Sequence, residues 1–562
     1  MEQSILNNYK RWLEKATDVD VAQELKAIEN NDEKIEDAFY RELEFGTGGL
    51  RGVIGAGTNR MNVYTVAKAS QGLANYVVNN FAVEDRKIAV SYDSRIKSDV
   101  FSKVAAGVFA ANGIKVYIYD QLMPTPCLSF AVRDLKCAAG IMVTASHNPS
   151  KYNGYKAYGA DGCQITNEVA DEVSGYIDNI DVFDGVKTMD FDKAMNEGLI
   201  QYTPAEVYTR FVENVKAESL LQGEKVNKDV AIIYTPLNGS GLKPVLRTLT
   251  ESGYTNVTVV KEQEQPDGNF PTCPYPNPEI KEAMALGMQY AKDNNADLLV
   301  ATDPDCDRVG IAVKNQEGEF VLLTGNQTGM LLLDYICQRR IALSKMPQDP
   351  VVVKTIVTTD MADRIAQSYG VRTINILTGF KYIGEQIALL EKEGKEDSYI
   401  LGFEESYGYL SGTYVRDKDA VNGTFLICEM FAYYQSKGIG LLDRLNELYS
   451  KFGYCLNSLH SYQFEGSAGF VKMKNIMSNL KKGIATIGGK KVEKTLDYSL
   501  GIDSLPKSDV VKFLLEDNCS VVVRPSGTEP KMKVYISVSA KTQEMAAELE
   551  KAMHSQMDEY LA

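Results

Sequence analysis

Short apolar segments rich in Val and Ile alternate with longer amphipathic stretches along most of the chain. Eight of these apolar segments predict buried strands, at residues 87–93, 115–120, 138–146, 229–236, 256–260, 296–303, 351–357 and 398–406. Strands that are apolar on both faces are typical of sheets covered by helices on both sides. The pattern therefore predicts several α/β units in tandem.

The C-terminal part of the chain follows a different pattern. Two apolar strands are predicted at 518–524 and 531–540, joined by a polar loop with no helix between them. A helix rich in Ala and Glu is predicted to follow, at 542–560. We expect this part to form a separate α+β domain.

A chain of 562 residues is too long for one hydrophobic core, because cores stop growing at roughly 250 to 300 residues. Hydrophobic residues make up 44% and charged residues 24%, as in ordinary globular proteins. We therefore expect three α/β domains with mixed sheets, at 1–204, 205–322 and 323–455, and an α+β domain at 456–562.

The formal net charge of −15 disfavours binding to nucleic acid or to anionic membranes. We expect no membrane span, since no run approaches the roughly 20 apolar residues needed, and a cytoplasmic location, since the N-terminal segment is charged where a signal peptide is apolar. The nine cysteines are scattered without Cys-x-x-Cys spacing, which favours reduced thiols. An acidic protein that handles phosphates must gather local donors in a cleft.

Ser146 ends the apolar run at 138–146 and is a candidate nucleophile. It lacks the Gly-x-Ser-x-Gly elbow of serine hydrolases, and the chain has only three histidines. His147 beside it and Lys156 ten residues later supply possible proton carriers and a cation, a set that suits phosphoryl transfer. By itself the segment fits a plain polar loop equally well.

Asp303, Asp305 and Asp307 follow another buried strand at a spacing of two residues. On extended backbone this spacing aims all three carboxylates the same way, as a hard divalent cation requires. An EF-hand is excluded because Arg308 and Lys314 replace its turn glycine and its bidentate glutamate. We expect a Mg²⁺ site, with Arg308 able to hold phosphate oxygens.

Three further loops are weaker candidates when taken singly. Residues 402–408 carry Glu404 and Ser406, which could grip sugar hydroxyls, and the segment 416–418 adds charge. The loop 524–531 offers Arg524, hydroxyls and a glycine turn suited to an anion, although a plain hairpin remains the alternative. The glycines at 45–52 lack the Lys-Ser/Thr of a P-loop and present Arg51.

Together these loops closely resemble those of the α-D-phosphohexomutase superfamily, in the branch that holds bacterial phosphoglucomutases and phosphopentomutases. The resemblance covers nearly the whole chain in order, through the motifs FGTGGLRG, TASHNPSKYNGYK, TPLNGSG, DPDCDR, LTGFKYIG, GFEESYG with RDKD, and RPSGTEPK. It implies four domains around one central active-site cleft, the first three being related α/β units.

The resemblance also implies roles for single residues. It makes Ser146 the phosphoserine, which ligates Mg²⁺ with Asp303, Asp305 and Asp307. It places Arg51, Lys156 and Arg308 around the transferring phosphoryl group, with His147 or Lys156 assisting proton transfer. The implied sugar contacts are Thr378, Gly379, Glu404, Ser406 and Lys418. The implied seat for the non-reacting phosphate is Arg524, Ser526, Gly527 and Thr528.

The activity implied by the resemblance is interconversion of α-D-glucose 1-phosphate and glucose 6-phosphate through glucose 1,6-bisphosphate. GFEESYG is followed by Tyr409 rather than carrying the Gly-His of dual phosphomannomutase/phosphoglucomutases, which favours glucose. Phosphopentomutase and phosphomannomutase remain alternatives, and a phosphatase or a non-catalytic sugar-phosphate sensor are alternatives of another class. We expect a small-molecule sugar phosphate as partner, and a monomer or weak oligomer.

Overall fold

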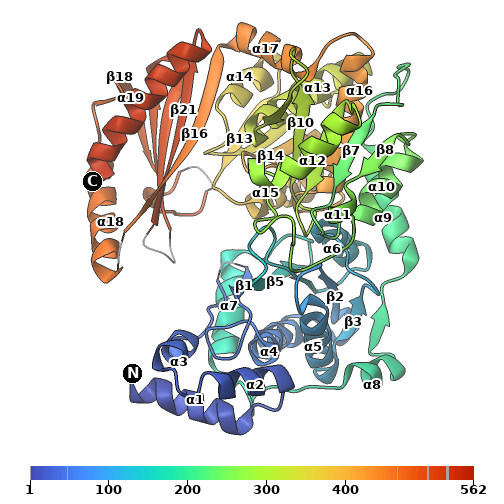
Figure 1. Cartoon of the computed structure of the whole chain (residues 1–562), viewed down its shortest axis with the longest axis vertical. Helices are drawn as coiled ribbons and strands as arrows, with labels where there is room; N and C mark the ends of the chain where they lie inside the picture. Colours follow the sequence, from blue (N-terminus) through green and yellow to red (C-terminus); the bar gives the residue numbers. More distant parts are fainter. Residues whose placement is uncertain (1, 47, 465, 503–504, 527–530, 562) are drawn as a thin grey trace.

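The computed structural model describes residues 2–46, 48–464, 466–502, 505–526 and 531–561. Within them, four sheets follow one another along the chain. In Figure 1 the first sheet and its helices lie at the bottom, the second and third lie above it, and the fourth stands at the upper left. No helix in these ranges is long and apolar enough to cross a membrane.

The first sheet is mixed. Its strands are Gly49–Val53 (β1), Lys87–Tyr92 (β2), Lys115–Ile118 (β3), Ala139–Val143 (β4), Tyr152–Gly159 (β5) and Ile200–Tyr202 (β6). Their order is β1-β5-β4-β2-β3-β6, and β5 runs antiparallel to both of its neighbours whereas β2, β3, β4 and β6 are parallel. Its helices are Val63–Asn80 (α4), Ser98–Ala111 (α5), Thr125–Asp134 (α6), Asn167–Asp178 (α7) and Phe191–Asn196 (α8).

Three short helices precede this sheet and form a small core of their own. They are Gln3–Lys15 (α1), Val19–Ala27 (α2) and Asp32–Phe39 (α3). The indole of Trp12 packs edge-on against Phe39 and Tyr64, so that the helices are fastened to the start of α4. Aromatic pairs of this kind add roughly 0.5–1.5 kcal/mol each beyond the area they bury.

The second and third sheets combine parallel and antiparallel strands. The second has the order β11-β10-β9-β7-β8, from Ile232–Thr235 (β7), Val257–Val259 (β8), Leu298–Thr302 (β9), Val309–Lys314 (β10) and Phe320–Leu323 (β11). The third has the order β13-β12-β14-β15, from Val351–Thr355 (β12), Arg372–Ile376 (β13), Tyr399–Glu404 (β14) and Gly408–Leu410 (β15). Their helices are Ala205–Ala217 (α9), Leu242–Glu251 (α10), Lys261–Glu264 (α11), Lys281–Asp293 (α12), Gly325–Ala342 (α13), Met361–Ser368 (α14), Phe380–Lys392 (α15), Ala420–Gln435 (α16) and Leu441–Phe452 (α17).

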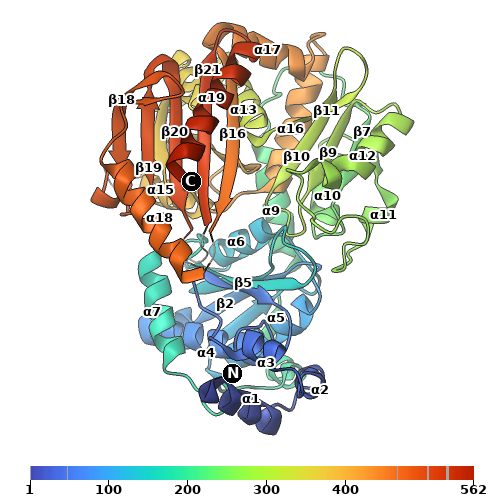
Figure 2. The same cartoon turned by 60° about the vertical axis from the view of Figure 1, so that its left-hand side comes forward.

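The fourth sheet is antiparallel throughout, in the order β16-β21-β20-β19-β18-β17. Its strands are Tyr454–Gln463 (β16), Thr486–Ile487 (β17), Lys490–Asp497 (β18), Val511–Leu515 (β19), Cys519–Pro525 (β20) and Lys531–Ala540 (β21). Two helices accompany it, Gly466–Lys481 (α18) and Gln543–Leu561 (α19). Figure 2 shows α19 lying across this sheet and α18 reaching down to the first domain beside α7.

The eight apolar runs are strands, as the sequence predicts. They correspond to β2, β3, β4, β7, β8, β9, β12 and β14. Every residue of β4, β9 and β12 is buried, because helices cover both faces of these sheets. The sequence did not predict β5, whose Tyr, Gly, Asn and Lys residues form no apolar run. The nine cysteines are free and buried.

A buried ion-pair network joins the third and fourth sheets. Asp360, just before α14, accepts from Lys512 Nζ of β19 at 2.7 Å and from Ser520 Oγ of β20 at 2.5 Å. Lys512 also donates to the backbone oxygen of Ile356 at 3.0 Å. Burial would raise the pKa of Asp360, but the charges of Lys512 and Lys354 outweigh it and lower that pKa below its usual range. The carboxylate of Asp360 therefore holds the two domains together.

We predict that Asp360→Asn lowers the stability of the protein by about 3 kcal/mol, because it leaves the Lys512 ammonium buried without its counter-charge. The measurement is urea unfolding at pH 7, with Asp349→Asn as the control. Asp349 is largely exposed, and its ion pair with Arg372 is long at 3.9 Å, so we expect a change below about 0.5 kcal/mol there. Equal effects of the two substitutions would contradict the assignment.

Candidate active site

Ser146 lies in a tight loop at the end of β4 and is 5% exposed. Its backbone has φ +51°, in the left-handed region that residues with a Cβ seldom adopt. The N–H of Ser146 donates to Thr144 Oγ1 at 2.7 Å, and its carbonyl oxygen accepts from the Arg95 guanidinium. These bonds offset the strain and fix the direction of the hydroxyl.

The Ser146 hydroxyl joins the first domain to the second. Its Oγ donates to Asp303 Oδ2 at 2.8 Å and lies 3.2 Å from His147 Nδ1. Burial, and next the charge of Arg308, lowers the pKa of His147 to about 2. The imidazole is therefore neutral near pH 7, so it can exchange hydrogen bonds with a hydroxyl but is a weak proton acceptor.

Asp303, Asp305 and Asp307 lie together at the end of β9, as predicted. All three are buried, and one carboxylate oxygen from each lies within 4.8 Å of the others. The expected extended backbone is wrong: residues 303–307 form a turn, in which the N–H of Cys306 donates to the Asp303 carbonyl at 2.9 Å. Cys306 has φ +51°, and this turn brings the carboxylates together where a strand would have spread them along its length.

The carboxylate group fits a divalent metal ion. Asp305 Oδ1 and Asp307 Oδ1 are buried and have no hydrogen-bond partner among the described residues. A buried carboxylate oxygen without a partner costs free energy, and a cation removes that cost. Hard divalent cations prefer carboxylate oxygens as ligands. These three aspartates can therefore hold a divalent metal ion.

Two lysines from other domains neutralise the same carboxylates. Lys156 Nζ of β5 lies 2.7 Å from Asp305 Oδ2 and 3.3 Å from Asp307 Oδ2. Lys418 Nζ, from the third domain, lies 3.0 Å from Asp307 Oδ2. Burial would raise the pKa of Asp305, but the charge and hydrogen bond of Lys156 outweigh it and lower that pKa. Burial, Asp307 and Asp305 raise the pKa of Asp303 well above its usual range.

The two arginines expected at the transferring group lie beside the aspartates. Arg51 on β1 stands opposite Gly154 in the register with β5, two residues from Lys156, and is exposed. Arg308 follows the aspartate turn, and its guanidinium donates to Glu279. In this structure the Arg308 guanidinium is thus directed to a carboxylate.

Glu404 ends β14 and is buried. Its Oε1 accepts from the N–H of Gly379 at 3.0 Å. Gly379 has φ +126°, which only glycine adopts without strain, so the backbone can turn its N–H toward Glu404 before α15 begins. Burial raises the pKa of Glu404 to about 7, even though Lys418 opposes the rise. Ser406 follows in the same loop and is half-buried.

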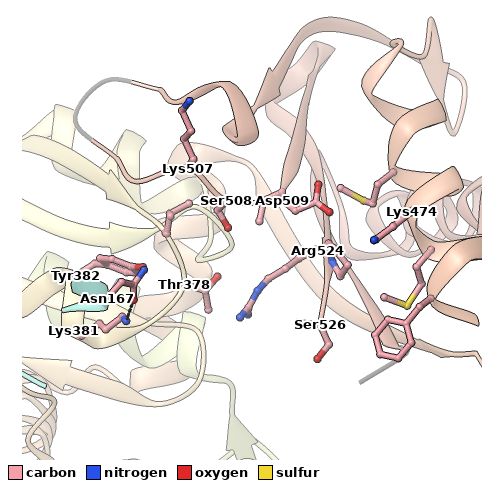
Figure 3. Close-up of a pocket in the computed structure, with 16 residues that line it drawn as sticks. Asn167, Thr378, Lys381, Tyr382, Lys474, Lys507, Ser508, Asp509, Arg524 and Ser526 are labelled. Carbon is pink, nitrogen blue, oxygen red and sulfur yellow. Dashed lines mark hydrogen bonds between the residues drawn. The ribbon is translucent and has the colours of Figure 1, made fainter. Parts of the chain in front are cut away.

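Thr378, Arg524 and Ser526 line one cavity of about 500 Å³ between the third and fourth sheets. Figure 3 shows the Arg524 side chain extending across the cavity toward Thr378, with Ser526 beyond it on the same strand end. Gly527 and Thr528, also expected here, lie outside the described residues. The described residues of the predicted phosphate-binding loop, Arg524 and Ser526, therefore line the same cavity as Thr378 of the predicted sugar-binding loop.

The sequence did not single out several residues that complete these sites. Thr125, at the start of α6, donates to Asp305 Oδ2 at 2.8 Å. Lys381, Lys474 and Lys507 line the cavity with Arg524, and Lys381 Nζ donates to Asn167 Oδ1 of the first domain at 2.8 Å (Figure 3). Lys381 lies within the LTGFKYIG motif, so the sequence offered a signal for it. Thr125, Lys474 and Lys507 lie in helix or loop sequence without a recognisable motif.

Four family models match the chain in order. They describe the phosphoglucomutase/phosphomannomutase α/β/α domains I, II and III, at residues 42–183, 206–318 and 324–452, and the C-terminal domain, at 473–554. Together with the mixed sheets and the antiparallel fourth sheet, they confirm the predicted fold class of three α/β domains followed by an α+β domain.

Sequence relatives match along almost the whole length. A phosphoglucomutase of Staphylococcus saprophyticus is 38% identical, over 90% of this chain and 92% of its own. A phosphoglucomutase of Staphylococcus epidermidis is 35% identical, over 93% of this chain and 96% of its own. The similarity is therefore not confined to one domain.

Solved structures share the fold at lower identity. The crystal structure of parafusin, a phosphoglucomutase from Paramecium, matches with a TM-score of 0.69 and 19% identity, over 93% of this chain and 94% of that one. A phosphoglucomutase/phosphomannomutase family protein of Burkholderia thailandensis matches with a TM-score of 0.68 and 17% identity, over 92% and 97%. By its four domains and its full-length relatives, the chain belongs to the phosphoglucomutase/phosphomannomutase family.

Proposed function

We propose that this chain is a phosphoglucomutase that interconverts α-D-glucose 1-phosphate and glucose 6-phosphate through a phosphoserine at Ser146 and glucose 1,6-bisphosphate. Full-length relatives named phosphoglucomutase, at 34 to 38% identity, favour this activity within the family. The observation that best supports this mechanism is the contact of 2.8 Å between Ser146 Oγ and Asp303. It brings the buried hydroxyl of a strained loop to the three carboxylates that can hold a metal ion.

Ser146 would act as a phosphoryl carrier. In one half-reaction the P–O bond to Ser146 breaks while a sugar hydroxyl forms a new P–O bond, and the proton lost by that hydroxyl ends on Ser146 Oγ. In the other, Ser146 Oγ regains a phosphoryl group from the opposite end of the bisphosphate. Transfer of this kind depends mainly on alignment and on cations near the developing charge, and little on covalent work by the protein.

The three aspartates, with the phosphate on Ser146, would hold Mg²⁺. Three anionic ligands and a phosphate suit this ion, which commonly bridges carboxylates and substrate phosphates. When bound, Mg²⁺ supplies Lewis-acid neutralisation of negative charge on the phosphoryl oxygens. The partnerless oxygens of Asp305 and Asp307 support this assignment.

The cations around the aspartates would stabilise the transferring group. Arg51, Lys156 and Arg308 can each donate to phosphoryl oxygens, and Arg308 would exchange Glu279 for them. His147, being neutral, would accept a hydrogen bond from the incoming hydroxyl. The pKa of Lys156 is raised, because Asp305 and Asp307 outweigh its burial. Lys156 would therefore stay protonated and donate hydrogen bonds to the phosphoryl oxygens.

The sugar would bind across the cavity of Figure 3. Glu404, Ser406, Thr378 and the backbone of Gly379 offer donors and acceptors for sugar hydroxyls, and Lys418 connects this loop to Asp307. The seat for the non-reacting phosphate would be Arg524, Ser526, Gly527 and Thr528. One seat can serve both half-reactions if the bisphosphate turns around between them.

We predict that Ser146→Ala lowers mutase turnover with glucose 1-phosphate by at least about 1000-fold, because the phosphoryl carrier is removed. The assay contains Mg²⁺ and a trace of glucose 1,6-bisphosphate, and intact-protein mass reports the phosphoryl group. Ser150→Ala, the same chemical change in the same loop, should keep both activity and phosphorylation. Full activity of Ser146→Ala would refute the carrier role.

The substrate is tested in the same assay. Mannose 1-phosphate and ribose 1-phosphate replace glucose 1-phosphate, and kcat/KM is compared among the three. We expect the highest value for glucose 1-phosphate. A preference for ribose 1-phosphate or mannose 1-phosphate would overturn the choice of sugar, and free phosphate as the main product would indicate a phosphatase.

We predict that Mg²⁺ stabilises the folded protein through the aspartate group. At 100 times its dissociation constant, the ion should add about 2.7 kcal/mol and raise the Tm. Asp305→Asn should abolish this Mg²⁺-dependent shift, whereas Asp293→Asn, on the exposed face of α12, should leave it unchanged. Thermal unfolding with and without Mg²⁺ provides the measurement. A full shift in Asp305→Asn would place the ion elsewhere.

We predict that Glu404 makes stability depend on pH between about 4.5 and 7. Its folded pKa of about 7 lies above the unfolded value, so the folded state binds more protons in this window and loses stability as pH rises, by up to roughly 1.4 kcal/mol per pH unit. Glu404→Gln should lack this loss, and exposed Glu393→Gln should retain it. Urea unfolding at pH 5, 6, 7 and 8 provides the comparison. Parallel pH profiles of wild type and Glu404→Gln would contradict the shift.

A further inference from the structure

A second cluster of side chains that could ligate a metal ion lies in the fourth domain. It consists of His460 on β16 and of Glu550 and His554 on α19. The chain has only three histidines, and two of them meet here. We propose that His460, Glu550 and His554 form a site for a transition-metal ion of the Zn²⁺ class, separate from the aspartate group.

The secondary structure brings the three side chains to one point. Glu550 and His554 are four residues apart, so they stand one turn above the other on the same face of α19. His460 faces them from the neighbouring strand, with its Nε2 at 2.8 Å from Glu550 Oε1. The rings of His460 and His554 stack at 3.5 Å between centroids. One ligand atom from each of the three residues lies within 4.8 Å of the others.

The ligand types select the class of ion. Imidazole nitrogens favour Zn²⁺, Ni²⁺ and Cu²⁺, whereas Mg²⁺ and Ca²⁺ favour sites made of oxygen. Two histidines and one glutamate form a recurrent zinc ligand set that leaves a position for water. The side chains of His460 and Glu550 are 23% and 16% exposed, and that of His554 is 33% exposed, so an ion can enter from solvent.

Neighbouring residues orient the ligands. Ser458 Oγ donates to Glu550 Oε1 at 2.6 Å. Asp558, one further turn along α19, lies 3.4 Å from His554 Nε2 and accepts from Tyr462 Oη at 2.6 Å. Carboxylates and hydroxyls around the ligands are usual supports of metal sites, because they fix ring orientation and tautomer. The two carboxylates also balance the charge of a divalent ion.

A simple ion pair between protonated His460 and Glu550 is the alternative. It pairs His460 with Glu550, and Asp558, at 3.4 Å from Nε2, would pair with His554 in the same way. Two imidazolium rings at 3.5 Å would repel one another. A metal ion bound by both imidazoles and by Glu550 avoids this repulsion. Binding would turn one ring out of the stack, because the nitrogen lone pairs of nearly parallel rings do not converge on one point.

The site lies on the face of the fourth sheet opposite to Arg524. His460 stands opposite Val534, Val534 stands opposite Val523, and adjacent residues of a strand point to opposite faces. His460 therefore lies on the α19 side, and Arg524, next to Val523, on the cavity side. Bound metal would fasten the C-terminal helix to β16 without touching the substrate cavity.

Zn²⁺ titration of the full-length protein tests the proposal, with Mg²⁺ in excess to occupy the aspartate group. We expect one Zn²⁺ to bind in the fourth domain and to shift the ring ¹⁵N signals of His460 and His554. His460→Gln and His554→Gln should each weaken this binding by more than about 100-fold, since loss of a mere supporting residue weakens metal sites 10- to 100-fold. Two variants are used so that misfolding of one leaves the other as a test.

The controls separate this site from the aspartate group. Glu550→Gln should weaken Zn²⁺ binding, whereas Glu548→Gln, the same change at an exposed position of α19, should leave it unchanged. Asp305→Asn should also retain the fourth-domain binding, and His554→Gln should retain wild-type turnover without added Zn²⁺. Equal Zn²⁺ affinity of wild type and both histidine variants would overturn the proposal. Absence of binding by wild type at millimolar Zn²⁺ would leave the ion pair as the role of the cluster.

Discussion

Three carboxylates buried side by side, those of Asp303, Asp305 and Asp307, set the constraint on which the site depends. Like charges in a buried position repel and lose their hydration, so they persist only where positive charge comes close. That charge arrives from other domains, on Lys156 from the first and Lys418 from the third. Closing the domains on one another is therefore coupled to neutralising the aspartates.

The same constraint explains why the Ser146 hydroxyl is held in one place. The Ser146 hydroxyl reaches Asp303 only because its loop is held in a left-handed conformation by Thr144 and Arg95. A freely rotating Ser146 side chain would lose entropy each time it met the aspartates. The strained loop removes that entropy cost in advance.

The fourth domain contributes in a different way. One link to the third domain is the contact of Asp360 with Lys512 of β19 and Ser520 of β20, two inner strands of its sheet. Arg524 and the metal-type cluster around His460 lie on opposite faces of that sheet. The sheet therefore places Arg524 in the cavity on one face while its other face packs against α19.

The sequence alone determined ten of the strands, the class of fold and the residue types of the chemical loops. Apolar runs are local signals. A serine, three aspartates or an arginine placed after such a run indicates a polar loop at a strand end, and this holds wherever the strand lies in the fold. The tertiary structure decided the rest. The lysines that pair with the aspartates and the meeting of His460 with α19 depend on contacts between segments far apart in the sequence. So does the contact of Ser146 with Asp303 across 157 residues. No local pattern records such contacts, because tertiary packing creates them.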